Sequence, residues 1–250
     1  MTPRQIIDAG PMHWRQWLVV LLMVILNALD GFDVLSSAFA APGITKEWGI
    51  ERSELGIVLS AELVGMGFGS ILLGGMADRM GRKIAMLTCL VLMALGMYLA
   101  STATSVNPML AFRFITGVGI GGMLAATNAV TAESSNLAFR RTAIAAYVAG
   151  YPLGAIIGGI AASQWLLPDH GWRAIFLFGA VVTALLIPIV ALLVPETVAF
   201  QATKRNLAGA NRTLNIFGKS PIDTLPAELE ESAKPRLTDI LSNPKLRPIT

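Results

Sequence analysis

Two carboxylates inside a helix-length apolar segment are the residues of this chain best suited to do chemistry. Asp30 and Asp33 stand in the stretch LNALDGFDVLSSAFAAPG, which covers residues 26–43. A charge at the centre of a bilayer costs roughly 2.5–3.5 kcal/mol on insertion scales, so such residues persist where they are paired, face water or have a function. The i, i+3 spacing puts both side chains on one helix face. The pair therefore predicts a site that could bind and release protons.

Two more charged residues, Glu62 and Arg113, fall inside other apolar segments. At a rise of about 1.5 Å per residue, Asp33, Glu62 and Arg113 are expected in one layer about 10 Å beneath the outer surface, with Asp30 about one turn deeper. One interpretation is a proton and anion pathway. The other is a structural ion pair between Arg113 and either Asp33 or Glu62. For Arg113 and Glu62 both stay open, but one arginine cannot neutralise three acids, which favours a function for the aspartates.

The composition is typical of a helical membrane protein. Hydrophobic residues make up 54% of the 250 residues and charged residues 14%, with a mean hydropathy of +0.63. A soluble domain usually carries about 25% charged residues. The single cysteine lies in an apolar run and the two histidines have no partner at ligand spacing. The sequence therefore predicts no disulfide framework, no metal site and no cofactor.

Six segments are long enough to cross a hydrocarbon core of roughly 30 Å, which takes about 20 helical residues. The predicted spans are 16–40, 55–77, 84–101, 108–132, 142–166 and 172–194. The expected fold is all-α, with a six-helix transmembrane domain over residues 1–195. A polar cytoplasmic segment over residues 196–250 follows, with one short amphipathic helix near 207–217.

Lysines and arginines collect on one side of these spans. The poorer side has three of them, at residues 46, 52 and 173. The richer side has eight in the segment after Val194 and seven more in the earlier links and the N-terminal segment. These seven are Arg4, Arg15, Arg79, Arg82, Lys83, Arg140 and Arg141. This asymmetry predicts that the N-terminus is cytoplasmic. The expected location is a bacterial-type inner (plasma) membrane, with several passes through it.

The link between the second and third predicted spans reads GGMADRMGRK and covers residues 74–83. Gly74 permits close contact between helices, and Gly81 permits a sharp turn. The charged residues of the link are expected to hold neighbouring helix ends through ion pairs and helix dipoles. They are Asp78, Arg79, Arg82 and Lys83.

Glycines at short, regular spacing occur in RFITGVGIGG, from residue 113, and in GYPLGAIIGG, from residue 150. Small residues at such spacing let membrane helices approach closely, and the prolines of such helices can kink them. The sequence predicts a kink at Pro152. It predicts helix packing or hinge surfaces at Gly117, Gly121, Gly150 and Gly154.

These motifs resemble those of the major facilitator superfamily. The link 74–83 matches the family signature between its second and third helices, and Arg113 with the glycines after it matches the motif of the fourth helix. Pro195-Glu196-Thr197 matches a common end of the sixth helix. The resemblance implies twelve helices in two halves, each built of two inverted three-helix repeats. The chain is then expected to be the N-terminal half, with its C-terminal half missing.

The resemblance also implies roles for particular residues. The predicted spans 16–40 and 108–132 would line a central cavity, which is where Asp30, Asp33 and Arg113 would sit. A basic residue of the signature loop pairs in relatives with an acid at the cytoplasmic end of the fourth helix. Glu133 is placed for that contact with Arg82.

Within the superfamily, the letters D-G-F-D at residues 30–33 are similar to an element of the aromatic acid:proton symporters. This resemblance implies proton-coupled import of a small aromatic carboxylate, such as benzoate or hydroxybenzoate, with both aspartates involved. Tyr151-Pro152 lacks the Gly-Pro order of the antiporter signature, which favours uptake over efflux.

Several alternatives remain open at this point. A symporter for a sugar or another organic anion, an efflux carrier, and a sensor or scaffold that does not transport are all compatible with six spans. An intramembrane aspartyl protease is disfavoured, because it needs two aspartates on different helices. The chain is therefore not expected to be an enzyme or to bind nucleic acid.

Overall fold

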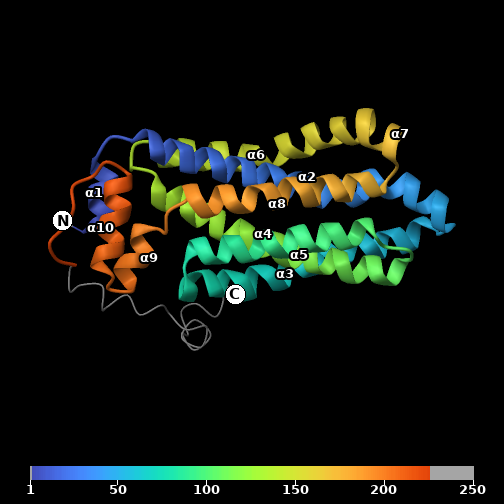
Figure 1. Cartoon of the computed structure of the whole chain (residues 1–250), viewed down its shortest axis with the longest axis horizontal. Coiled ribbons are helices and arrows are strands. Elements are labelled where there is room, and N and C mark those ends of the chain that lie inside the picture. The colour runs from blue at the N-terminus through green and yellow to red at the C-terminus, as the bar shows by residue number, and fades with distance from the viewer. Residues whose placement is uncertain (1, 226–250) are drawn as a thin grey trace, which may run out of the picture.

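The computed structural model describes residues 2–225, and all regular secondary structure in this range is helical. Six of its helices are long and apolar enough to cross a membrane. They lie along the long axis of the molecule, and three short helices gather at one end (Figure 1). The predicted all-α membrane fold is confirmed. The part of the predicted polar segment beyond residue 225 lies outside the described residues.

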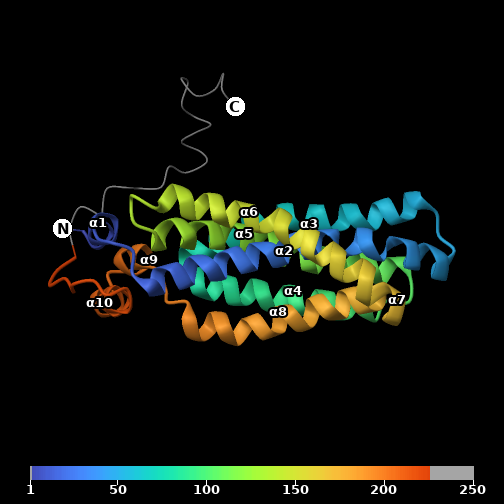
Figure 2. The same ribbon diagram turned by 90° about the horizontal axis from the view of Figure 1, so that it is seen from above.

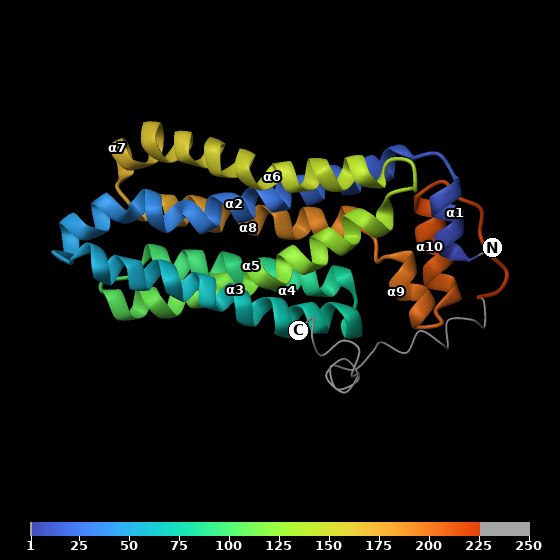
Figure 3. The same cartoon turned by 180° about the vertical axis from the view of Figure 1, so that it is seen from behind.

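The six long helices alternate in direction, so that helices that follow each other along the chain run antiparallel (Figures 2 and 3). They are α2 (Trp14–Trp48), α3 (Arg52–Met80), α4 (Arg82–Ser101), α5 (Val106–Ser134), α6 (Arg140–Ala161) and α8 (Arg173–Leu193). A π-helical segment, η1 (Ala162–Leu166), and a single turn, α7 (Leu167–His170), connect α6 to α8. The three short helices at the end of the bundle are α1 (Pro3–Ala9), α9 (Val198–Thr203) and α10 (Leu207–Ile216).

The first predicted span, 16–40, is too short. Helix α2 continues through Pro42 to Trp48, where Gly49 adopts a left-handed conformation with φ +63° and its N–H bonds to the Thr45 carbonyl at 3.0 Å. Hydropathy stops the prediction where polar residues begin, whereas the helix extends past the apolar stretch and ends at a glycine cap. The fifth predicted span, 142–166, lies within a helical stretch from Arg140 to His170 that could cross a membrane, and its last five residues form the π-helical η1.

Both ends of the described chain hold more helix than the sequence predicted. Helix α10 confirms the amphipathic helix expected near 207–217, but α9 and α1 were not predicted. Each had a visible start signal. The Thr2 hydroxyl accepts from the Gln5 N–H at 3.2 Å in a capping box, and the Thr197 hydroxyl accepts from the Phe200 N–H at 3.3 Å.

Close packing of backbones holds the long helices together, with α3 against α5 and α2 against α6. A Cβ added at any of the four predicted packing glycines would lie 1.8–2.6 Å from a carbonyl oxygen of the facing helix. These four glycines lie at close contacts between helices, and their role as packing or hinge surfaces stays a prediction. Gly74 does not lie at such a contact, since its added Cβ would lie 3.6 Å from the Ala125 Cβ. Helix α6 continues through Pro152 as α-helix.

Candidate functional site

The four predicted intramembrane charges are enclosed within the helical bundle. Asp30 and Asp33 of α2 and Arg113 of α5 have no exposed surface, and Glu62 of α3 is 1% exposed. The expectation that α2 and α5 present these groups to an open cavity is therefore wrong for the described structure. Neighbouring helices cover these groups because α2 packs against three helices, α5, α6 and α8.

Arg113 of α5 contacts residues of four other long helices in this layer. Its Nη2 donates to Glu62 Oε2 in a short ion pair and to the main-chain carbonyl of Asp33 at 2.7 Å. Its Nη1 lies 3.0 Å from Met97 Sδ, and its guanidinium lies 5.4 Å from the centre of the Phe176 ring. The expected common layer of Asp33, Glu62 and Arg113 is thus present. Of the two partners proposed for Arg113, the structure selects the Glu62 carboxylate.

The two aspartate carboxylates lack hydrogen-bond partners within residues 2–225. Neither oxygen of Asp30 or of Asp33 has one, and Glu62 Oε1 has none either. Buried polar groups are nearly always hydrogen-bonded, and an unpartnered buried charge is costly. Three acids and one arginine are therefore buried in this part of the bundle, so the acids outnumber the cations. No group of His, Cys, Asp or Glu in the described part of the chain could hold a metal ion.

A second charged cluster lies at the end of the bundle where α4 begins. Arg82 Nη2 lies 3.3 Å from Glu133 Oε1, and Arg82 Nη1 lies 3.1 Å from Asp78 Oδ1. The expected contact between Arg82 and Glu133 is therefore made. Lys83 Nζ donates to the Ala191 carbonyl at 2.6 Å and so joins α4 to the end of α8. Arg79 is exposed.

Glu196 also belongs to this cluster, and the sequence predicted no role for it. Its two carboxylate oxygens accept from the main-chain N–H groups of Arg82 at 3.0 Å and Lys83 at 3.2 Å, which caps the start of α4. Gly81 turns the chain there with φ +112°, and a Cβ at that position would lie 2.2 Å from Glu196 Oε2. The motif Pro195-Glu196-Thr197 was the available signal.

Comparison with known proteins agrees with this geometry. A sequence profile of the Major Facilitator Superfamily matches residues 21–247. The chain belongs to this superfamily. It is 33% identical over 211 residues to the 4-hydroxybenzoate transporter PcaK of Pseudomonas aeruginosa, covering 84% of this chain and 46% of that protein. It is 32% identical over 199 residues to a gallate transporter of Pseudomonas putida, covering 80% of this chain and 44% of that protein. The chain thus spans about half the length of these relatives.

The fold is also that of solved superfamily members. The xylose transporter XylE from E. coli, in a partially occluded inward-open conformation, superposes with a TM-score of 0.70 at 18% identity. The match covers 80% of this chain and 55% of XylE. At this identity the likeness concerns the fold alone. Superfamily members are transporters and not enzymes, which agrees with the expectation from the sequence.

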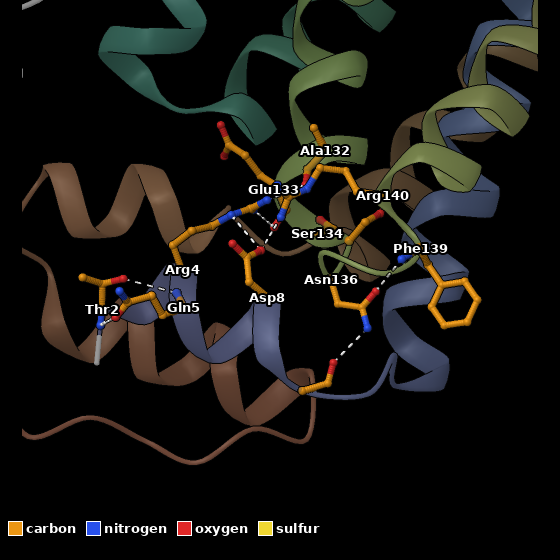
Figure 4. A network of polar contacts seen from close by, with 12 residues as sticks. Thr2, Arg4, Gln5, Asp8, Ala132, Glu133, Ser134, Asn136, Phe139 and Arg140 are labelled. Atoms are coloured by element: carbon orange, nitrogen blue, oxygen red, sulfur yellow. Dashed lines mark hydrogen bonds and ion pairs between the residues drawn. The ribbon is translucent and has the colours of Figure 1, made fainter.

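The N-terminal helix α1 adds a network to the charged end of this superfamily chain (Figure 4). Arg4 donates to the main-chain carbonyls of Glu133 at 2.7 Å and Ala132 at 2.9 Å, and Asp8 pairs with both Arg4 and Arg140. Burial lowers the pKa of Arg4, and the neighbouring Asp8 carboxylate opposes that change. Helix α1 therefore satisfies carbonyls at the C-terminal end of α5 and ties that end to α6.

Proposed function

We propose that the intact protein imports a small aromatic carboxylate, such as a hydroxybenzoate or benzoate, together with protons. The observation that carries this proposal is the pair of buried Asp30 and Asp33 carboxylates without hydrogen-bond partners beside the Arg113–Glu62 ion pair. The identity of 33% to a 4-hydroxybenzoate transporter and of 32% to a gallate transporter supports the substrate class. The proposed location is a bacterial-type inner membrane, with the α10 end of the bundle in the cytoplasm.

Proton coupling follows from the charge of the substrate. An anion entering a cell is opposed by the inside-negative potential, at about 2.3 kcal/mol per charge per 100 mV. Entry together with at least one proton removes that penalty. In the proposed cycle Asp30 or Asp33 takes a proton from outside, and Arg113 provides the positive charge that offsets the anion.

The charged cluster at the α10 end is the proposed site of alternating access. We assign Gly74–Lys83 and Glu133 the role of a latch that opens and recloses as this six-helix half rocks against a C-terminal half. The contacts of Arg82 with Asp78 and Glu133 are partly exposed, so they can break without stranding a buried charge. The close glycine contacts between α3 and α5 would keep these two helices fixed against each other during the motion.

Uptake measurements test this function. Cells that make the intact protein are expected to accumulate radiolabelled 4-hydroxybenzoate, and a protonophore is expected to abolish that accumulation. The double variant Asp30→Asn with Asp33→Asn is expected to lower uptake at least about tenfold, which equals about 1.4 kcal/mol. The exposed Asp169→Asn serves as the matched control and should transport normally.

Four results would overturn the proposal. Full protonophore-sensitive uptake by the double variant would show that the aspartates do not carry the proton. Accumulation of xylose in place of aromatic acids would favour a sugar symporter, and faster loss of preloaded 4-hydroxybenzoate would favour an efflux carrier. Binding of the acid without any flux would instead support a sensor.

A further inference from the structure

A groove opens at the α10 end of the bundle, where α2 begins and α8 ends. Its main cavity has a volume of about 740 Å³ and is bordered by the ends of these two helices and by α9 and α10. A second cavity of about 700 Å³ shares part of its wall and extends the groove along α10. Figures 1 and 2 show α9 and α10 lying across this end of the long helices. The groove therefore lies where the membrane-spanning helices end.

The charged lining of the groove is mostly basic. Arg15, Lys83 and Arg212 are its cations, and Glu196 is its acid. The Glu196 carboxylate is already occupied by main-chain N–H groups at the start of α4. The Lys83 ammonium donates one of its three N–H groups to the Ala191 carbonyl, which leaves two for a ligand. Three cations therefore face one acid that is already bound, which suits the groove to an anion.

The guanidinium groups of Arg15 and Arg212 have N–H donors that are available to a ligand. Both side chains are exposed. Within residues 2–225 the guanidinium of Arg15 contacts only the Trp14 ring, at 5.2 Å from its centre, and that of Arg212 makes no hydrogen bond or ion pair. A guanidinium offers five N–H donors in a planar fork that matches two oxygens of a phosphate group.

The wall next to these cations is apolar. Leu192 is 82% exposed and Leu193 is 46% exposed, and both lie at the end of the membrane-spanning helix α8. Trp14, at the start of α2, is 61% exposed. Tryptophan is enriched where a membrane meets water, and exposed leucines on a spanning helix face hydrocarbon. The anion that fits this groove therefore carries an apolar tail.

We propose that the groove binds an acidic phospholipid. Its phosphate lies among Arg15, Lys83 and Arg212, and an acyl chain follows the exposed leucines of α8. Basic pockets between helix ends are suited to anionic headgroups. The occupied site would hold the amphipathic helix α10 against the ends of α2 and α8. This inference concerns a lipid and does not rest on the proposed substrate or on proton coupling.

Native mass spectrometry of the purified protein tests the proposal. Phosphatidylglycerol added to the delipidated protein is expected to bind about tenfold more tightly than phosphatidylcholine. The variant Arg15→Gln with Arg212→Gln is expected to lose that preference. The control variant Arg141→Gln with Lys204→Gln removes two exposed cations outside the groove and is expected to keep it. Inorganic phosphate, added as a competitor, separates a free anion from a lipid.

Each of the other outcomes overturns the proposal. Equal binding of the two lipids, or the same loss of preference in both variants, would reduce the effect to general charge attraction. Displacement of phosphatidylglycerol by millimolar inorganic phosphate would show an anion site without a lipid tail. Because the replaced arginines are exposed, both variants are expected to unfold at the same temperature as the unaltered protein, and that measurement is made alongside.

Discussion

Two of the arginine–glutamate pairs that join helices in the described part of the chain, Arg113–Glu62 and Arg82–Glu133, have different surroundings. The Arg113 and Glu62 side chains are 0% and 2% exposed, and the unpartnered carboxylates of Asp30 and Asp33 lie on the helix that Arg113 contacts. The Arg82 and Glu133 side chains are 17% and 19% exposed, and the extra acid there is bound by main-chain N–H groups. The interior cluster therefore has acids without partners. In the end cluster the additional acid, Glu196, caps the start of α4.

This difference separates two uses of the same residue pair. In the interior, desolvation makes each unpaired charge costly, so removing one partner of the Arg113–Glu62 pair is expected to destabilise the bundle. At the end of the bundle, water weakens each ion pair, so the contacts can open at little cost. We therefore expect interior substitutions to change stability strongly and end substitutions to change motion more than stability.

The largest effect is expected from Arg113→Met. This variant leaves the Glu62 carboxylate buried without its cation, which is expected to lower the free energy of unfolding by about 3–5 kcal/mol. Unfolding of the purified protein in mixed micelles with increasing denaturing detergent measures this loss. Uptake of 4-hydroxybenzoate should fall to background in the same variant.

The matched control replaces both partners. Arg113→Met combined with Glu62→Met removes the stranded charge, and buried ion pairs replaced by apolar residues of similar volume are often as stable as before. The double variant is expected to regain most of the stability but none of the uptake. If it stays as unstable as the single variant, the pair does not determine stability in the way described.

An intermediate effect is expected from Gly117→Ala, which tests how the interior cluster is positioned. A Cβ at residue 117 would lie 2.1 Å from the main-chain oxygen of Glu62, so α3 must move away from α5. Overpacking of this kind costs about 1–3 kcal/mol. Gly67→Ala on α3 is the control, because nothing lies within 4 Å of its added Cβ. Equal melting temperatures for the two variants would contradict the proposed contact.

The sequence predicted the interior cluster better than the end cluster, and the reason is physical. A charge within an apolar run is visible without a structure, and its depth follows from the helical rise, so the layer of Asp33, Glu62 and Arg113 could be expected. Its enclosure within the bundle could not, since that depends on how α2 packs against several other helices.

At the end of the bundle, contacts between distant residues decide the structure. The contact between Arg82 and Glu133 was found through a family motif, but the cap by Glu196 bridges residues 113 and 114 positions apart. Arg4 reaches the end of α5 across 128 and 129 positions. The motif around Glu196 marked that residue, but local sequence does not show which distant residues such side chains contact. Helix α1 itself was readable from its capping box, whereas its docking site was not.

The smallest effect on stability is expected from Glu133→Gln, and this variant sharpens the comparison most. The amide keeps the size of the side chain and removes its charge, and a partly exposed ion pair contributes less than about 1 kcal/mol. If the end cluster is a latch, 4-hydroxybenzoate uptake should change several-fold while the melting temperature stays nearly constant. Substitution of one partner of the interior pair, in contrast, is expected to change uptake and stability together. Arg141→Gln, an exposed change at the same end, should leave both quantities unaltered. A large loss of stability in Glu133→Gln would instead make the end pair a structural contact like the interior one.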